Sequence, residues 1–175
     1  MLKKIISGGQ TGVDRAALDA AIHQGLSCGG WIPANRRAED GPLSSHYPMR
    51  PLAKGGYLAR NRLNVQDSDA TLIFTDGPVS GGTARTVEFA QRLNRPLLVV
   101  QIQSCLQDPD LISTLCQWIT AHPIQTLNIA GPRESRQPGI YQKSFNCLIK
   151  LIEKLQDPHP LDQADPDNKN YSACA

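Results

Sequence analysis

The sequence predicts a three-layer α/β/α fold whose central sheet is mostly parallel and has about five or more strands. Short apolar runs alternate with longer stretches of helical periodicity, which is typical of a parallel sheet with helices on both faces. Two of the apolar runs end in glycine-rich turns that lead into helices. We expect a single ligand-binding domain over residues 1–155, followed by a polar, mobile C-terminal tail over residues 156–175.

Hydrophobic periodicity and helix-ending residues define the expected elements. Continuous apolar runs predict strands, whereas apolar residues spaced three or four apart predict helices. The expected strands span residues 3–7, 27–32, 70–75, 97–102 and 124–130. The expected helices span residues 13–24, 58–67, 81–93, 108–120 and 140–155.

In the first half of the chain, individual residues set the limits of these elements. Gly25 is a natural C-cap for the first helix, and Pro33 ends the second strand. The second helix is expected to turn Leu58, Leu63 and Val65 inward. The third strand, ATLIFT, is apolar almost throughout, as expected of a strand that is buried on both faces.

In the second half, the run LLVVQI gives the strongest strand signal, and Pro109 suits the first turn of the helix that follows. Ile140, Leu148 and Ile152 share one face of the last helix. Residues 34–57, by contrast, contain prolines, glycines and basic side chains without periodicity. A loop of this length in a compact domain is usually functional or disordered.

The two strand–glycine–helix corners are the main functional signal. Such a corner collects free backbone N–H groups at the positive end of a helix dipole, which favours binding of an anion. Because the carboxyl ends of parallel strands share one edge of the sheet, both corners are expected to face one ligand. The residues predicted to bind it are Gly8, Gly9, Gln10, Thr11 and Gly12 in the first corner, and Gly81, Gly82, Thr83 and Thr86 in the second.

Loops beyond other strand ends add arginine and polar side chains. Arg36 follows the second strand, and Arg133, Glu134 and Ser135 follow the fifth. The guanidinium fork suits phosphate and other oxyanions because it donates two parallel hydrogen bonds. We therefore add these four residues to the predicted anion site. The alternative for Arg133 and Glu134 is a surface ion pair without a functional role.

The same residues also have structural interpretations. Asp14 suits a helix cap or a dipole partner as well as it suits catalysis, and Thr83 suits an N-cap. The sequence has no Walker A or GxGxxG motif, no Ser-His-Asp order and no metal-ligand spacing. General acid–base chemistry would fall to Asp14, Asp40, Glu88 or Glu134. We predict no catalytic residue and no metal site, and a binding protein rather than an enzyme.

Composition narrows the choice of partners. The net charge of +2 gives no argument for nucleic acid or an anionic membrane, and no apolar run is long enough to span a bilayer. Because no targeting signal is evident, we expect a cytoplasmic protein. The five cysteines are widely spaced and form no CxxC motif, so neither a disulfide framework nor a zinc site is indicated.

Five segments resemble the molybdenum cofactor carrier protein family. They are GGQTGVDRAALDAA (8–21), GGWIPANRRAEDG (29–41), RNRLNVQDSDATLIF (60–74), SGGTARTVEFA (80–90) and NIAGPRESRQPGI (128–140). The resemblance covers residues 1–155. It implies a Rossmann-like fold of the superfamily that contains the LOG-type nucleotide phosphoribohydrolases, whose relatives commonly form homo-oligomers.

The resemblance implies a carrier whose ligand is the molybdenum cofactor (molybdopterin), a pterin dithiolene with a phosphate and an oxo-metal end. A molybdate- or tungstate-like oxyanion is a related ligand, and molybdenum enzymes would accept the cofactor. One alternative is a LOG-type nucleoside-monophosphate phosphoribohydrolase, because Gly81, Gly82, Thr86 and Glu88 loosely resemble the PGGxGTxxE phosphate motif. The other alternative is a module that senses a nucleotide or phosphate.

Overall fold

The computed structural model of the chain describes residues 1–103, 108 and 110–157. Six parallel strands form one sheet in the order β5-β2-β1-β8-β6-β7. Their bounds are β1 Lys4–Ile6, β2 Ser27–Ile32, β5 Met49–Pro51, β6 Ala70–Thr75, β7 Leu97–Gln101 and β8 Thr126–Ala130. A small antiparallel hairpin, β3 (Arg37–Ala38) and β4 (Gly41–Pro42), stands apart from the sheet.

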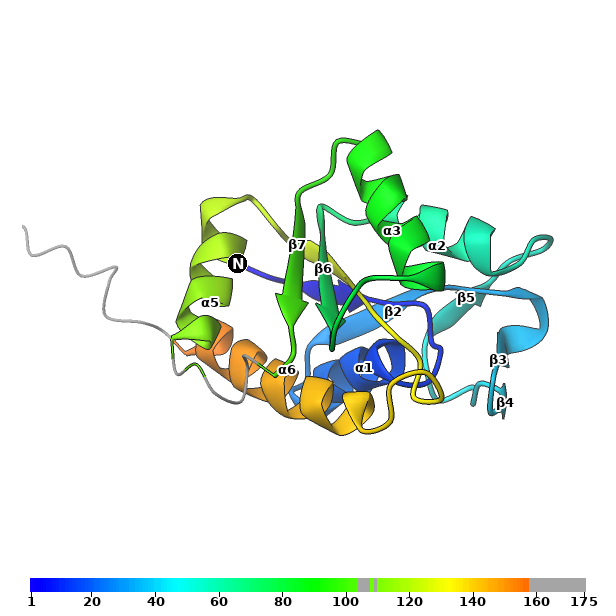
Figure 1. Cartoon of the computed structure of the whole chain (residues 1–175), viewed down its shortest axis with the longest axis horizontal. Coiled ribbons are helices and arrows are strands. Elements are labelled where there is room, and N and C mark those ends of the chain that lie inside the picture. The colour runs from blue at the N-terminus through cyan, green and yellow to red at the C-terminus, as the bar shows by residue number, and fades with distance from the viewer. Residues whose placement is uncertain (104–107, 109, 158–175) are drawn as a thin grey trace, which may run out of the picture.

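The helices form a layer on each face of the sheet, so the predicted Rossmann-like α/β/α architecture is confirmed (Figure 1). Helices α1, α5 and α6 pack together on one face, and α2 and α3 pack together on the other. Their bounds are α1 Val13–His23, α2 Tyr57–Gln66, α3 Gly81–Arg92, α5 Leu111–Ala121 and α6 Ile140–Gln156, with a short 3-10 helix η1 at Ala34–Arg36.

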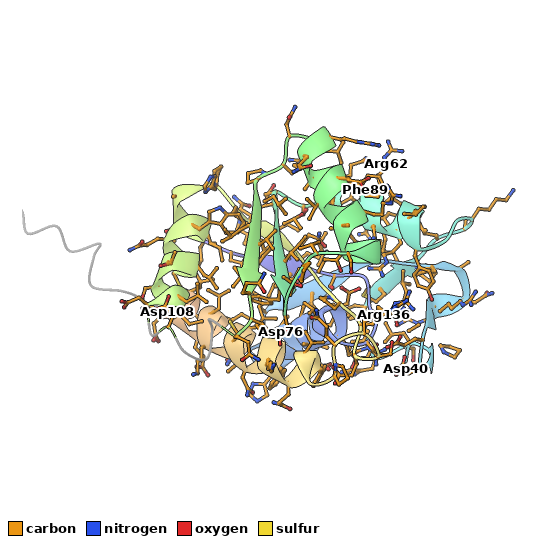
Figure 2. The ribbon with its side chains drawn as sticks, in the orientation of Figure 1. Asp40, Arg62, Asp76, Phe89, Asp108 and Arg136 are labelled. Carbon is orange, nitrogen blue, oxygen red and sulfur yellow. The ribbon has the colours of Figure 1, made fainter. Side chains whose placement is uncertain are left out.

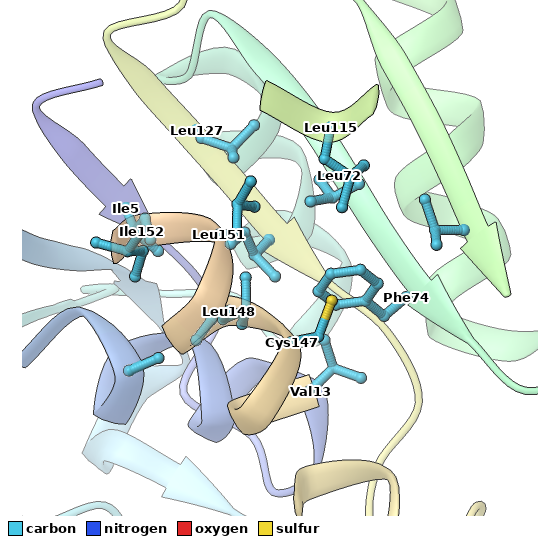
Figure 3. Packing of buried hydrophobic residues seen from close by; sticks show 14 of the residues in the cluster. Ile5, Val13, Leu72, Phe74, Leu115, Leu127, Cys147, Leu148, Leu151 and Ile152 are labelled. Carbon is cyan, nitrogen blue, oxygen red and sulfur yellow. The ribbon is translucent and has the colours of Figure 1, made fainter. Parts of the chain in front are cut away.

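The two faces of the sheet differ in chemistry. Alternate residues of β6 and β8, such as Leu72, Phe74 and Leu127, join the main apolar core with α1, α5 and α6 (Figure 3). On the opposite face, Asn128 donates from Nδ2 to Thr71 Oγ1 at 3.2 Å, and both residues are buried. The side of β6 and β8 that faces α2 and α3 therefore carries buried polar side chains.

The prediction for α2 was right about the helix and about Val65, but wrong about Leu58. Leu58 is 57% exposed, whereas Arg60, Asn61 and Asn64 are buried together with Val65. These polar side chains are tolerated inside because the Asp14 carboxylate of α1 and the backbone carbonyls of Ser7 and Gly82 accept their hydrogen bonds.

Residues 34–57, expected to be a loop without regular structure, contain η1, the β3–β4 hairpin and the edge strand β5. Arg36 holds this segment together. Its guanidinium donates to the carbonyl oxygens of Leu43 (2.8 Å), Ser44 (2.6 Å), Tyr47 (2.8 Å) and Met49 (3.4 Å).

The expectations for Pro109 and for the tail beyond residue 157 lie outside the described residues. None of the helices in the described ranges is both long enough and apolar enough to cross a bilayer.

Replacing Arg36 with alanine should therefore destabilise the fold by about 2 kcal/mol, because part-buried carbonyls lose a charged donor. Urea denaturation measures this loss, and Arg37→Ala, at the exposed neighbouring position, should cost less than about 0.5 kcal/mol. Equal effects of the two substitutions would contradict the role assigned to Arg36.

Candidate functional site

Three loops meet at the carboxyl edge of the sheet and enclose a cleft of about 530 Å³. They follow β1, β8 and β6, which are neighbours in the sheet. From β1 the chain enters α1 on one face, and from β6 it enters α3 on the other, so a crevice opens between the departing chains (Figure 1). The lining residues are Gln10, Asp14, Tyr57, Arg60, Asn61, Pro78, Ser80, Gly81, Gly82, Thr83, Thr86, Ala130, Gly131, Pro132, Arg133, Arg136 and Gln137.

The N-terminus of α3 forms one wall of the cleft. Its N-cap, Ser80, makes no capping hydrogen bond through its side chain, and the N–H groups of residues 81–83 have no recorded partner in the described part of the chain. The Gly82 carbonyl, in contrast, accepts from Asn61 Nδ2 (3.0 Å) and Thr86 Oγ1 (3.2 Å), which fixes the turn. This wall therefore presents backbone donors and the positive end of a helix dipole.

A buried ion pair forms the floor. Arg60 Nη1 donates to Asp14 Oδ2 at 2.8 Å, and the two side chains are only 10% and 5% exposed. Burial raises the pKa of Asp14 above its ordinary value, and the neighbouring Arg60 offsets this only in part. Arg60 lies directly on Gly8, where a Cβ atom would come within 1.3 Å of Nη1. Gly8 therefore makes room for the arginine rather than for a ligand.

Gln10 lines the cleft and has a buried side-chain donor without a partner among the described residues. Its Oε1 accepts from the N–H groups of Thr11 (3.1 Å) and Glu39 (2.8 Å), which fixes the orientation of the amide. The buried Nε2 then has no partner within the described residues, and neither does Nε of Arg60. Buried donors of this kind are rare unless a water or ligand satisfies them, so Gln10 is a strong candidate for ligand contact.

Two further arginines come from the β8–α6 loop. The Arg133 guanidinium lies 5.1 Å from the centre of the Tyr57 ring, and Arg60 lies 5.9 Å from the same ring. Arg136 is exposed, lines the cleft, and has no side-chain hydrogen bond or ion pair among the described residues (Figure 2). The cleft therefore combines three guanidinium groups with the backbone donors of α3, and among the described residues Asp14 is the only carboxylate in its lining.

Glu39 binds several of the residues predicted to hold an anion. Its carboxylate accepts from the hydroxyls of Thr11 and Ser135 and pairs with Arg133 at 3.7 Å. The pKa of Glu39 lies below its ordinary value. Partial burial alone would raise this pKa, but the hydrogen bonds from Ser135 and Thr11 and the charge of Arg133 together lower it by more. The predicted donors thus do meet an anion, but the anion belongs to the chain itself.

Of the thirteen predicted site residues, Gln10, Gly81, Gly82, Thr83, Thr86 and Arg133 line the cleft. The others lie nearby or elsewhere. Gly9 packs under Leu43, and Arg36 donates to carbonyls of its own loop. Glu134 caps α6 by accepting from the N–H groups of Gly139 and Tyr141. Of the two structural interpretations of Asp14, the structure does not show the cap: the N-cap of α1 is Gly12 without a side-chain capping bond, and Asp14 lies in the first turn.

Sequence reasoning missed Tyr57, Arg60, Asn61, Arg136 and Gln137. Charged and amide residues on a short helix are usually solvated, so Arg60 and Asn61 gave no signal of burial. The available signal was the weakness of the apolar stripe on that helix, which left its inward face unexplained. Within the described ranges, no group of three or more His, Cys, Asp or Glu residues could hold a metal ion.

The comparisons with known proteins concern the family and the fold. Residues 5–152 match the sequence profile described as "Circularly permutated YpsA SLOG family". A crystal structure of the "Putative molybdenum carrier protein" from Syntrophus aciditrophicus SB is similar, with 41% identity and a TM-score of 0.80. The similarity covers 89% of this chain and 95% of that one. No curated protein sequence matches.

Proposed function

This chain belongs to the circularly permutated YpsA SLOG family, and we propose that it is a carrier protein that binds the molybdenum cofactor or a related molybdenum oxyanion in the cleft. The name of the similar Syntrophus protein supports molybdenum as part of the ligand. One observation carries the proposal: the α3 N-terminus, Gln10 and Arg136 all line the cleft, and each has donors without a partner among the described residues. Such donors suit phosphate and metal-oxo groups alike.

The hydrolase alternative gains no support from the site. Glu88, which the phosphoribohydrolase interpretation requires, is absent from the lining and pairs with Arg85 at 2.8 Å. The carboxylate that does line the cleft, Asp14, is held by Arg60. We therefore propose binding without turnover. We also propose that the protein is a homo-oligomer and delivers its ligand to molybdenum enzymes.

Arg136→Ala should weaken the binding of molybdate by about tenfold, because a charge-assisted hydrogen bond is lost at a partly solvated site. Isothermal titration with molybdate measures the dissociation constant. Arg62→Ala is the matched control, since Arg62 is an exposed arginine on α2 outside the cleft lining (Figure 2). Gel filtration with the intact cofactor then tests whether the whole ligand co-elutes.

The proposal fails if neither molybdate nor the cofactor binds the folded protein. It also fails if Arg62→Ala and Arg136→Ala weaken binding equally, because the anion would then respond to net charge and not to the cleft. Raising the salt concentration should weaken binding moderately in the native protein, as expected for a partly screened site.

A further inference from the structure

The carboxylate of Glu39 is surrounded by hydroxyl, backbone N–H and guanidinium donors, which are the groups that bind oxyanions in proteins. Oε2 accepts from Ser135 Oγ at 2.6 Å, and Oε1 accepts from the Ser135 N–H at 3.4 Å and from the Thr11 hydroxyl. Arg133 adds a positive charge at 3.7 Å. Two hydroxyls, one backbone N–H and one guanidinium from two separate loops thus converge on one carboxylate.

The neighbouring carboxylates Glu134 and Asp40 already have partners. Glu134 is turned toward the start of α6, where it accepts from the N–H groups of Gly139 and Tyr141. Asp40, next to Glu39 in the hairpin, pairs with Arg15 at 3.2 Å. Glu39 is therefore the carboxylate that neutralises this donor set in the described structure.

The hairpin that carries Glu39 is anchored independently of this carboxylate. Ala38 and Leu43 on either side are buried, and the Glu39 N–H donates to Gln10 Oε1. The Glu39 side chain itself is 20% exposed. The side chain can therefore rotate into solvent while the hairpin backbone stays in place.

We propose that Thr11, Ser135 and Arg133 form a second oxyanion site beside the cleft, which Glu39 fills from within the chain and which an external carboxylate or tetrahedral oxyanion occupies by displacing that side chain. Arg133 belongs to this site and also lines the cleft. Glu39 consequently competes with an anion in the cleft for Arg133. An anion in the cleft weakens the binding of the Glu39 side chain to the second site, and Glu39 weakens anion binding in the cleft by the same factor. Only this coupling to the cleft rests on the proposed function.

The test measures formate and phosphate binding by thermal shift and titration, against sodium chloride at equal ionic strength. Glu39→Ala should bind both anions in a saturable way, on the order of tenfold more tightly than the native protein. Adding Ser135→Ala to this variant should remove the gain. Asp40→Ala is the matched control, because its partner is Arg15 without the two hydroxyls, and it should show no such gain.

No gain in Glu39→Ala, or an equal gain in Asp40→Ala, overturns the inference. If Glu39→Ala does not fold, Glu39→Gln keeps a side chain of the same shape without the charge and should show a smaller gain in the same direction. A gain for formate in a protein that binds no molybdate would leave this site standing and remove the proposed function. If the native protein binds molybdate but Glu39→Ala binds formate and phosphate no more tightly, the second site is overturned and the proposed function stands.

Discussion

Replacing Arg60 with methionine should lower the free energy of unfolding by about 3–5 kcal/mol at neutral pH, the largest loss we expect from one side chain of the site. Methionine keeps much of the side-chain volume and removes the partner of a carboxylate that is 5% exposed. The ionised Asp14 would then be buried without compensation. Chemical denaturation of the native and variant proteins measures the difference.

The pH dependence separates this cause from lost packing. Burial already raises the pKa of Asp14, and without Arg60 it rises further, so the folded variant holds the Asp14 proton more tightly than the unfolded chain does. The ionic part of the loss should therefore shrink as the pH falls from neutral into the acid range. The double variant Arg60→Met/Asp14→Asn has no carboxyl at position 14 to take up a proton, so its loss should not shrink as the pH falls. A constant loss in Arg60→Met alone would contradict the account.

Replacing Gly12 with alanine should destabilise the protein by about 3 kcal/mol, because the substitution affects both the backbone and the contact between two loops. Gly12 has φ +75° and ψ −132°, a conformation that other residues rarely adopt. A Cβ atom would also lie 2.4 Å from the Pro132 carbonyl oxygen and 2.7 Å from the Glu134 nitrogen. The loops after β1 and β8 would have to separate, which would also disturb the cleft.

Gly25→Ala is the control for this prediction. Gly25 has φ +65°, but no atom lies within 4 Å of the added Cβ. This substitution should therefore cost only the backbone strain, about 1 kcal/mol. Urea denaturation of both variants gives the comparison, and equal losses would show that the loop contact at Gly12 contributes nothing.

The order of strands and helices could be predicted from the sequence, because the spacing of apolar residues in a segment indicates both its type and its buried face. The apolar run of β6 and the glycine corner before α3 lie where the pattern places them. The edge strand β5 was missed, since Met49–Pro51 has three residues, ends in proline and shows no alternation. A pairing of that length depends on its neighbour β2 and not on local sequence.

The arrangement of side chains in the site was harder to predict. Backbone donors at Gly81 and Gly82 follow from topology alone, since every strand of a parallel sheet ends at the same edge. The positions of Arg60 and Arg36 depend on where their donors find acceptors across the fold: one meets a carboxylate of α1, the other meets carbonyls of its own loop. The sequence shows that an arginine is present, but not which partner it finds.

Tungstate can replace molybdate in crystals, and its anomalous scattering would locate the anion directly. The central claim is that backbone donors of α3 and the arginines of the cleft hold an oxyanion together. We expect the strongest anomalous peak in the cleft, within hydrogen-bonding distance of the N–H groups of residues 81–83 and of Arg136. An ordered tungstate outside the cleft, with the cleft itself empty at saturating concentration, would contradict the claim.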